Sequence, residues 1–117
     1  MLKIAVFVSG GGTDLQSVID AIEANQINGK IVLVISNRKN AYGLERAKKA
    51  GIETAVVKKD DELIVKMLKE REVDLVVLAG YLAILSDVLI DAYPNKIINI
   101  HPSLIPSFCG PGYYGMH

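Results

Sequence analysis

The sequence predicts an α/β fold: a doubly wound, open sheet of parallel strands with helices on both faces. Strand-like apolar runs alternate with segments of helical periodicity along the 117 residues, a pattern typical of parallel sheets. Hydrophobic residues make up 50% of the chain, which is enough for a buried core. The connections are short, and right-handed crossovers leave few topologies. Among these we favour the strand order 3-2-1-4-5, in which the winding direction reverses between strands one and four.

The expected strands are continuous apolar runs bounded by turn residues. The first covers residues 2–9 and ends in a cluster of glycines. The other four are expected at residues 31–35, 54–57, 73–79 and 96–101. Most of these runs do not alternate with polar residues, which indicates strands that are buried on both faces.

Helical spacing of apolar residues predicts a helix after each of the first two strands. The first helix is marked by four apolar residues on one face, Leu15, Val18, Ile19 and Ile22. Thr13 with Gln16 three residues later fits a capping box that opens this helix. The second helix is expected at residues 44–50, with Gly51 as its C-terminal cap.

Two further helices are expected before the fourth and fifth strands. Apolar residues between positions 63 and 68 mark the third helix, with Asp60 or Asp61 at its start. Apolar residues between positions 85 and 92 mark the fourth, with Ser86 near its start. Both patterns place one apolar face against the sheet.

The charge and cysteine content narrow the classes of partner. Thirteen basic residues balance thirteen acidic ones, so there is no electrostatic case for nucleic acid or an anionic membrane surface. Cys109 is the only cysteine, which excludes an internal disulfide and a cysteine-rich zinc site. We therefore expect small-molecule partners, no metal and a cytoplasmic setting.

The segment SGGGTDLQ, residues 9–16, follows the first strand. Glycines let the backbone approach an anion, and the next helix directs N–H groups at it. A phosphate-bearing ligand is one interpretation, and a tight turn without a ligand is the other. No lysine follows the glycines, so this is not a nucleotide P-loop. Leu15 occupies the third glycine position of a dinucleotide fingerprint. Asp14 could bond a sugar hydroxyl or assist the helix start.

The segment AGYLAIL, residues 79–85, follows the fourth strand and is unusually apolar for a loop. Taken alone, it is better explained by core packing under the next helix. The functional alternative is an apolar wall for a flat ring, with backbone groups that pair with the edge of the ring.

The segment NIHPSLIP ends the fifth strand. Asn99 and His101 lie two residues apart, so their side chains project from the same strand face. Pro102 keeps His101 extended and ends the regular strand. An imidazole changes charge near neutral pH, and a carboxamide can donate to an oxyanion. Catalysis and a structural role for the histidine both remain open from these residues alone.

These three segments, together with SNRKNAYGLERAKKAGI at residues 36–52, resemble the glycinamide ribonucleotide formyltransferases of purine biosynthesis. The resemblance covers essentially the whole chain and implies a Rossmann-like formyltransferase fold. It also implies transfer of a formyl group from 10-formyltetrahydrofolate, the donor co-substrate, to the amine of glycinamide ribonucleotide. This is a reaction of one-carbon metabolism.

The resemblance also implies roles for individual positions. The ribonucleotide and its phosphate would be held by three residues of the glycine segment, Gly12, Thr13 and Asp14. The pterin ring of the folate would be gripped by four residues of the second segment, Leu82, Ala83, Ile84 and Leu85. Asn99 would contact the formyl group, and His101 would be the catalytic histidine.

The chain departs from the family pattern in several places. Gly11 and Asp14 stand where the family usually has asparagine. An arginine that contacts folate is absent after the third strand, where Lys58 or Lys59 could partly substitute.

Length is the largest departure from the family. Family members continue well beyond NIHPSLIP, with more strands and a catalytic aspartate. We therefore expect residues 1–117 to form a single domain that corresponds to the N-terminal part of the family's domain. We also expect the chain alone to be nearly inactive, and its fifth strand to present an open edge that favours self-association.

Three alternatives remain open at this point. Formyltetrahydrofolate hydrolase shares the Asn-x-His-Pro pattern but normally carries a regulatory domain before the first strand. Methionyl-tRNA formyltransferase would require a basic surface. An inert remnant that only binds a phosphate-bearing ligand belongs to a different class.

Overall fold

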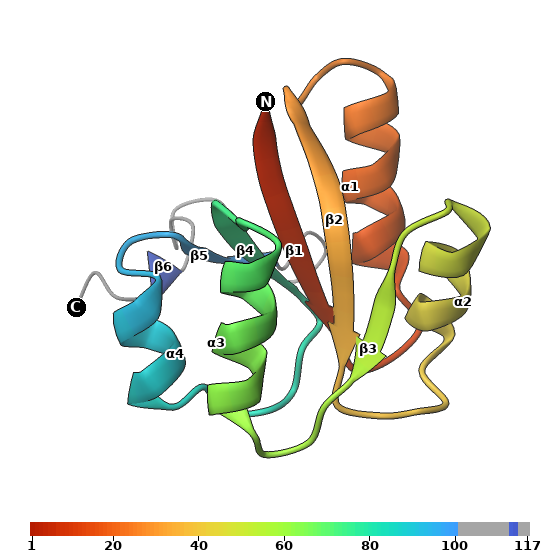
Figure 1. The fold of residues 1–117 in the computed structure, drawn as a ribbon. Coiled ribbons are helices and arrows are strands. Elements are labelled where there is room, and N and C mark those ends of the chain that lie inside the picture. Colours follow the sequence, from red (N-terminus) through yellow and green to blue (C-terminus); the bar gives the residue numbers. More distant parts are fainter. Residues whose placement is uncertain (101–112, 115–117) are drawn as a thin grey trace.

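The computed structural model describes residues 1–100 and 113–114, and these form one six-stranded sheet (Figure 1). The strand order is β3-β2-β1-β4-β5-β6, so the predicted order 3-2-1-4-5 is confirmed for the first five strands. The strands are β1 (Leu2–Val8), β2 (Gly29–Ser36), β3 (Thr54–Val56), β4 (Leu75–Ala79), β5 (Ile97–Ile100) and β6 (Tyr113–Tyr114). The first five strands are parallel, and β6 pairs antiparallel with β5.

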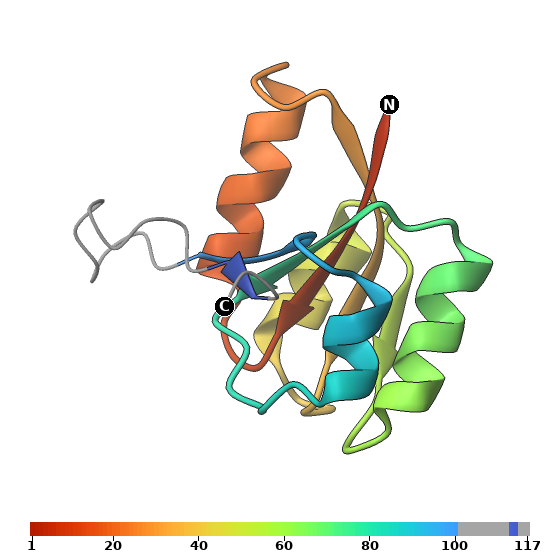
Figure 2. The ribbon, with the colours of Figure 1, turned by 90° about the vertical axis from the view of Figure 1, so that its left-hand side faces the viewer.

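Four helices cover the two faces of the sheet, as the sequence predicts. They are α1 (Thr13–Glu23), α2 (Tyr42–Lys49), α3 (Asp61–Glu70) and α4 (Asp87–Ala92). Figure 2 shows α1 on one side of the sheet and α3 and α4 on the other. Within the described residues, no helix has the length and apolar composition needed to cross a bilayer.

The core consists of two hydrophobic layers that share the sheet. Alternate residues of β1 serve different layers: Val6 and Val8 pack on the α1–α2 side, whereas Ala5 and Phe7 pack on the α3–α4 side. All four are fully buried. Because both faces of β1 are covered, its apolar run is continuous rather than alternating. Burial of each large side chain contributes about 1.5–3 kcal/mol.

The predicted capping box of α1 is wrong. The N-cap residue is Gly12, which has φ 79 in the left-handed region, and no side chain caps this helix. Thr13 is instead the first helical residue. The Gln16 side chain donates to Asp20 Oδ1 at 3.0 Å and accepts from Arg46 Nη1 at 3.3 Å. The left-handed glycine moves the helix start by one residue, which removes Thr13 from the capping position.

The other predicted helix ends agree better with the structure. Asp60 is the N-cap of α3, and its carboxylate accepts a hydrogen bond from the Leu63 amide at 3.1 Å. Gly51 follows α2 with φ 76, the left-handed conformation expected of a glycine at a helix C-terminus. Ser86 is the N-cap residue of α4, although its side chain makes no capping bond.

The edge of β5 differs from the expectation of an open strand. Ile97 and Ile98 pair with Tyr114 and Tyr113 of β6, so this part of the edge is covered. Self-association through the edge stays a prediction.

Candidate active site at the carboxyl ends of the strands

The carboxyl ends of β1, β4 and β5 lie side by side. Phe7 of β1 is in register with Leu78 of β4, which is in register with Asn99 of β5. The sheet order reverses at β1 and β4, and ligands of such sheets bind beyond the carboxyl ends of strands at this point. The segments that follow β1 and β4 therefore start from neighbouring positions at one end of the sheet, toward the bottom of Figure 1.

The glycine segment after β1 is held against α2. The Gly43 amide donates to the Gly10 carbonyl at 3.0 Å, and Arg46 Nε donates to the Gly11 carbonyl at 2.8 Å. A Cβ placed on Gly12 would lie only 2.6 Å from the Gly43 Cα, so the two backbones meet without side chains. By contrast, a Cβ on Gly10 or Gly11 would meet no described atom within 4 Å beyond its chain neighbours. Among the described residues, nothing therefore covers the outer side of this segment.

Thr13 and Asp14 form the first turn of α1. Thr13 is exposed and Asp14 is partly buried. Asp14 Oδ2 lies 4.0 Å from the position that a Cβ would occupy on Gly80, just after β4. The carboxylate therefore lies between the glycine segment and the end of β4. This position suits a hydrogen bond to a sugar hydroxyl, and the helix dipole stabilises the negative charge there.

A cavity of about 490 Å³ opens beside the second predicted segment. Its lining comes from the loops after β2, β3 and β4 and from the start of α3: Asn37, Lys58, Lys59, Asp61, Tyr81, Leu82, Ala83 and Ile84. Leu82 and Ile84 are 72% and 94% exposed. Exposed apolar side chains at a concave site are typical of a ligand pocket. Three of the four residues predicted to grip a ring therefore line one cavity.

Leu85, the fourth residue of that group, does not line the cavity. Its side chain packs against the α3–α4 layer of the core. The Leu82 amide also has an intramolecular partner, since it donates to Ser9 Oγ at 2.8 Å. Pairing with a ring edge would therefore fall to other backbone groups of this segment.

Tyr81 lines the cavity and also packs against the core. Its ring contacts Phe7 edge-to-face, with centroids 5.2 Å apart, an arrangement favoured by the ring quadrupoles. Burial raises the pKa of the Tyr81 hydroxyl, and the Asp61 carboxylate raises this pKa further. The hydroxyl therefore stays protonated at neutral pH and remains a hydrogen-bond donor.

Ser9 connects the two predicted binding segments, although no role for its side chain is predicted from the sequence. It is 1% exposed, and its hydroxyl donates to Asn37 Oδ1 at 2.6 Å while accepting from the Leu82 amide at 2.8 Å. One oxygen thus links the end of β1, the loop after β2 and the apolar segment after β4. The partners of Ser9 are distant along the chain, so its linking role leaves little trace in the sequence. The one local feature is that a polar residue ends an apolar run.

We predict that Ser9→Ala lowers the free energy of unfolding by about 1–3 kcal/mol, because the Leu82 amide loses its acceptor. Hydrogen exchange at the Leu82 amide should also accelerate. Ser17→Ala is the control, since the Ser17 hydroxyl donates only to the Thr13 carbonyl, at 3.2 Å on the exposed side of α1. Urea unfolding of both variants provides the comparison. Equal stability of the two variants would contradict the linking role of Ser9.

Asn99 is partly buried near the end of β5. Alternation along the strand places its side chain on the same face as Ile97, which belongs to the α3–α4 layer. This is also the side from which Asp61 and Tyr81 line the cavity. His101, the predicted catalytic partner, lies outside the described residues.

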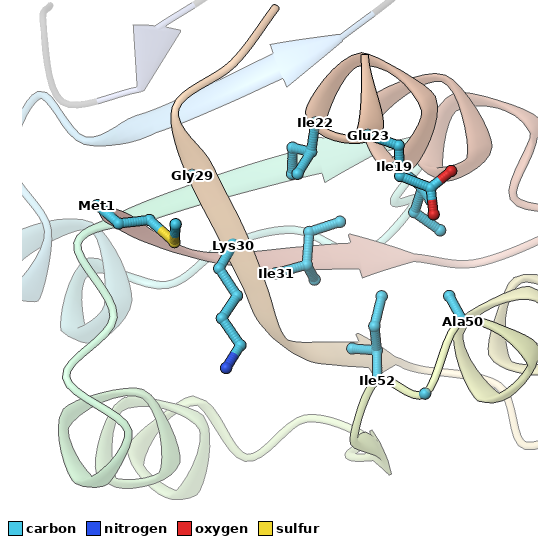
Figure 3. A pocket seen from close by; sticks show the side chains of 10 residues that line it. Met1, Ile19, Ile22, Glu23, Gly29, Lys30, Ile31, Ala50 and Ile52 are labelled. Atoms are coloured by element: carbon cyan, nitrogen blue, oxygen red, sulfur yellow. The ribbon is translucent and has the colours of Figure 1, made fainter. Parts of the chain in front are cut away.

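A second cavity of about 340 Å³ lies at the opposite end of β1 and β2. Figure 3 shows Ile22, Ile31 and Ile52 around this space, with Glu23 and Lys30 also lining it. It is far along the strands from the switch point and holds none of the predicted site residues. We therefore assign the candidate site to the cavity at the carboxyl ends.

Metal binding has no visible support in the part of the chain that the structure describes. No group of three or more His, Cys, Asp or Glu side chains there could hold an ion. The absence of a metal from the reaction stays a prediction.

Comparison with known proteins identifies the family of the chain. Residues 2–116 match the family described as formyl transferase. The chain belongs to this family. It is 47% identical to the phosphoribosylglycinamide formyltransferase of Haemophilus influenzae, over 97% of the chain and 58% of the relative. It is 38% identical to the enzyme of the same name from Escherichia coli, over 93% of the chain and 55% of the relative.

Solved structures of the formyl transferase family share the fold. Glycinamide ribonucleotide transformylase 1 from Symbiobacterium toebii superposes with a TM-score of 0.83 at 40% identity. The match covers 92% of this chain and 55% of that structure. The chain thus spans little more than half the length of the relatives described here. The predicted α/β class and the predicted family are confirmed.

Proposed function

We propose that the protein transfers a formyl group from 10-formyltetrahydrofolate to the amine of glycinamide ribonucleotide, in purine biosynthesis. One observation carries this proposal: a glycine segment at a helix start and an apolar cavity meet at one end of the sheet, joined through Ser9 Oγ. The names of the relatives, phosphoribosylglycinamide formyltransferase, support this choice of acceptor.

The acceptor side of the site is built on the start of α1. We assign the ribonucleotide phosphate to the backbone amides of Gly11, Gly12 and Thr13, because glycines and the first N–H groups of a helix bind anions. Asp14 is assigned to a ribose hydroxyl, since a carboxylate accepts that bond but repels a phosphate. The open outer side of Gly10 and Gly11 leaves room for the ligand.

The donor side is the cavity next to α3. We assign the pterin ring to the segment from Leu82 to Leu85, with Leu82 and Ile84 as the apolar contacts. Lys58 and Lys59 are exposed and line the same cavity. They are suited to the carboxylates of the folate's glutamate tail. Asn99 approaches from β5 on the same sheet face.

The chemistry requires stabilisation of one developing negative charge. The acceptor amine attacks the formyl carbon, a C–N bond forms, and the carbonyl electron pair moves to oxygen. The Asn99 amide and protonated His101 would donate hydrogen bonds to this oxyanion. When the intermediate collapses, the bond to N10 of the folate breaks. The proton lost by the amine then balances the proton gained at N10.

Water is the alternative acceptor, as in the formyltetrahydrofolate hydrolases. The glycine segment favours a phosphate-bearing acceptor, because water needs no such site. Formate release that is independent of glycinamide ribonucleotide would identify a hydrolase instead.

We predict that glycinamide ribonucleotide shifts the amide signals of Gly11, Gly12 and Thr13 before others in the ¹⁵N-labelled protein. The reason is that these N–H groups would meet the phosphate. Inorganic phosphate serves as the minimal ligand, and tetrahydrofolate should instead shift signals from Leu82 to Leu85. The assignment fails if both phosphate ligands leave the glycine signals unchanged while other signals move.

We further propose a cytoplasmic location and small-molecule substrates, with no nucleic-acid or membrane partner. The single cysteine and the zero net charge support this. The relatives from Arabidopsis thaliana and Vigna unguiculata are named chloroplastic. Location can therefore differ among relatives that share this sequence pattern.

A further inference from the structure

The segment AYGLER, residues 41–46, belongs to the family resemblance but has no part in the proposed reaction. It forms the start of α2, and two of its residues hold the glycine segment. The Gly43 amide binds the Gly10 carbonyl, and Arg46 Nε binds the Gly11 carbonyl. A Cβ on Gly43 would lie 3.0 Å from Val8 Cγ2, so a side chain there would require Val8 to shift by a few tenths of an ångström.

Because the peptide bond is planar, the contacts that hold these two carbonyls also fix the directions of the neighbouring N–H groups. In a trans peptide the carbonyl of one residue and the N–H of the next point in opposite directions, and no described peptide bond is cis. When α2 holds the carbonyls of Gly10 and Gly11, the amides of Gly11 and Gly12 are turned away from α2. The Gly12 carbonyl accepts the Gln16 amide at 2.8 Å. The Thr13 N–H is therefore turned away from the body of α1.

The Arg46 side chain is held in this geometry by two further contacts. Its Nη1 donates to Gln16 Oε1 at 3.3 Å, and its guanidinium lies 5.2 Å from the centre of the Tyr42 ring. Because the contacts with Gln16 and Tyr42 already hold the planar guanidinium, little further conformational freedom is lost when Nε donates to the Gly11 carbonyl. The contact therefore fixes a peptide orientation that glycine residues would not keep by themselves.

We propose that Arg46 and Gly43 are positioning residues for the ribonucleotide site: they orient the amides of Gly11 and Gly12 before the phosphate arrives. This inference rests on the proposed function. In this role Arg46 donates one hydrogen bond from its Nε–H to the Gly11 carbonyl. The positive charge of Arg46 does not contact the ligand. Preorganised amides bind an anion more tightly because no ordering cost is added on binding.

The test separates the donor of Arg46 from its charge. Glutamine places a neutral N–H donor at the chain position of Arg46 Nε, whereas methionine has similar length and no donor. We expect Arg46→Met to weaken binding of glycinamide ribonucleotide by about 10- to 100-fold. Arg46→Gln should recover most of this loss. Lys49→Met is the matched control, since Lys49 lies 6.0 Å from the same Tyr42 ring and should leave the affinity unchanged.

Calorimetric titration of each folded variant with the ribonucleotide, and separately with tetrahydrofolate, gives the readout. Tetrahydrofolate affinity should stay unchanged in all variants. A general loss of structure would weaken the binding of both ligands, so it would not produce this difference. If Arg46→Gln binds as weakly as Arg46→Met, or if Arg46→Met binds normally, the positioning role is overturned. If the unaltered protein binds no ribonucleotide, the proposed function itself fails.

Discussion

Replacing Asn99 with alanine is expected to lower the rate of formyl transfer by about 10²- to 10³-fold, the usual cost of removing an oxyanion donor. The residue lies at the end of β5, in register with Leu78 beside the switch point of the sheet. An amide there can donate to charge that exists only in the transition state. The loss should therefore appear in kcat, with little change in the KM of either substrate.

The assay measures transfer from 10-formyltetrahydrofolate to glycinamide ribonucleotide. It is run with the chain alone and with the remaining portion of the Haemophilus influenzae relative supplied in trans, and the active form provides the baseline. Asn99→Asp keeps the shape but replaces the donor with an acceptor, so it should be at least as slow. Lys96→Ala, an exposed change before the same strand, is the control. Normal activity of Asn99→Asp would contradict the role of Asn99 as a hydrogen-bond donor to the oxyanion.

His101 belongs to the same prediction, although it lies outside the described residues. Loss of a proton-transfer group costs about 10²- to 10⁴-fold, so His101→Ala should be at least as impaired as Asn99→Ala. If the two groups serve one oxyanion, the double variant should be less impaired than the product of the single effects. An active His101→Ala protein would exclude the histidine from the mechanism.

Gly12→Ala should produce the largest loss of stability, about 2–5 kcal/mol. A left-handed backbone costs an alanine about 1–2 kcal/mol, and overpacking adds about 1–3 kcal/mol. Both apply at this position, because φ is 79 and the added Cβ would lie 2.6 Å from the Gly43 Cα. The neighbouring atom is backbone, so it cannot move aside as a flexible side chain would. The free energy of unfolding in urea measures the effect.

Two other glycines separate these contributions. Gly51 has φ 76 and open space around its Cβ position, so Gly51→Ala should show only the backbone cost of about 1–2 kcal/mol. Gly10 does not have a positive φ, and a Cβ there would meet no described atom within 4 Å beyond its chain neighbours. Gly10→Ala should therefore stay within about 0.5 kcal/mol of the unaltered chain. If Gly12→Ala loses no more unfolding free energy than Gly51→Ala, the close approach of α2 to Gly12 does not contribute to the loss.

Most of the fold follows from local sequence features. Buried strands and helices contain apolar residues in continuous runs or at regular spacing. These patterns locate β1 and β4 by their apolar runs, and α1 by the helical spacing of Leu15, Val18 and Ile19. The capping box failed because Thr13 and Gln16 satisfy the pattern, while the left-handed Gly12 takes the capping position. The two residues of β6 lie below the length at which any periodicity can be recognised.

The candidate site was predictable only in part, for a related reason. The glycine segment and the Leu82–Ile84 lining have local signals in glycine content and unusual apolarity. Ser9 and Arg46 do not, because their importance comes from partners that are distant in sequence: Leu82 for Ser9 and Gly11 for Arg46. Such contacts become visible only when the strand order brings the loops together.

The position of β1 in the sheet has a consequence for biosynthesis. The first strand of the chain pairs with β2 on one edge and with β4 on the other. A ribosome releases β2 soon after β1, but residues 75–79 of β4 emerge much later. At typical elongation rates this delay is about 2–9 s, during which one edge of an apolar strand has no native partner. Nascent chains on neighbouring ribosomes can pair with that edge, so the yield of folded protein should depend on translation speed between β2 and β4.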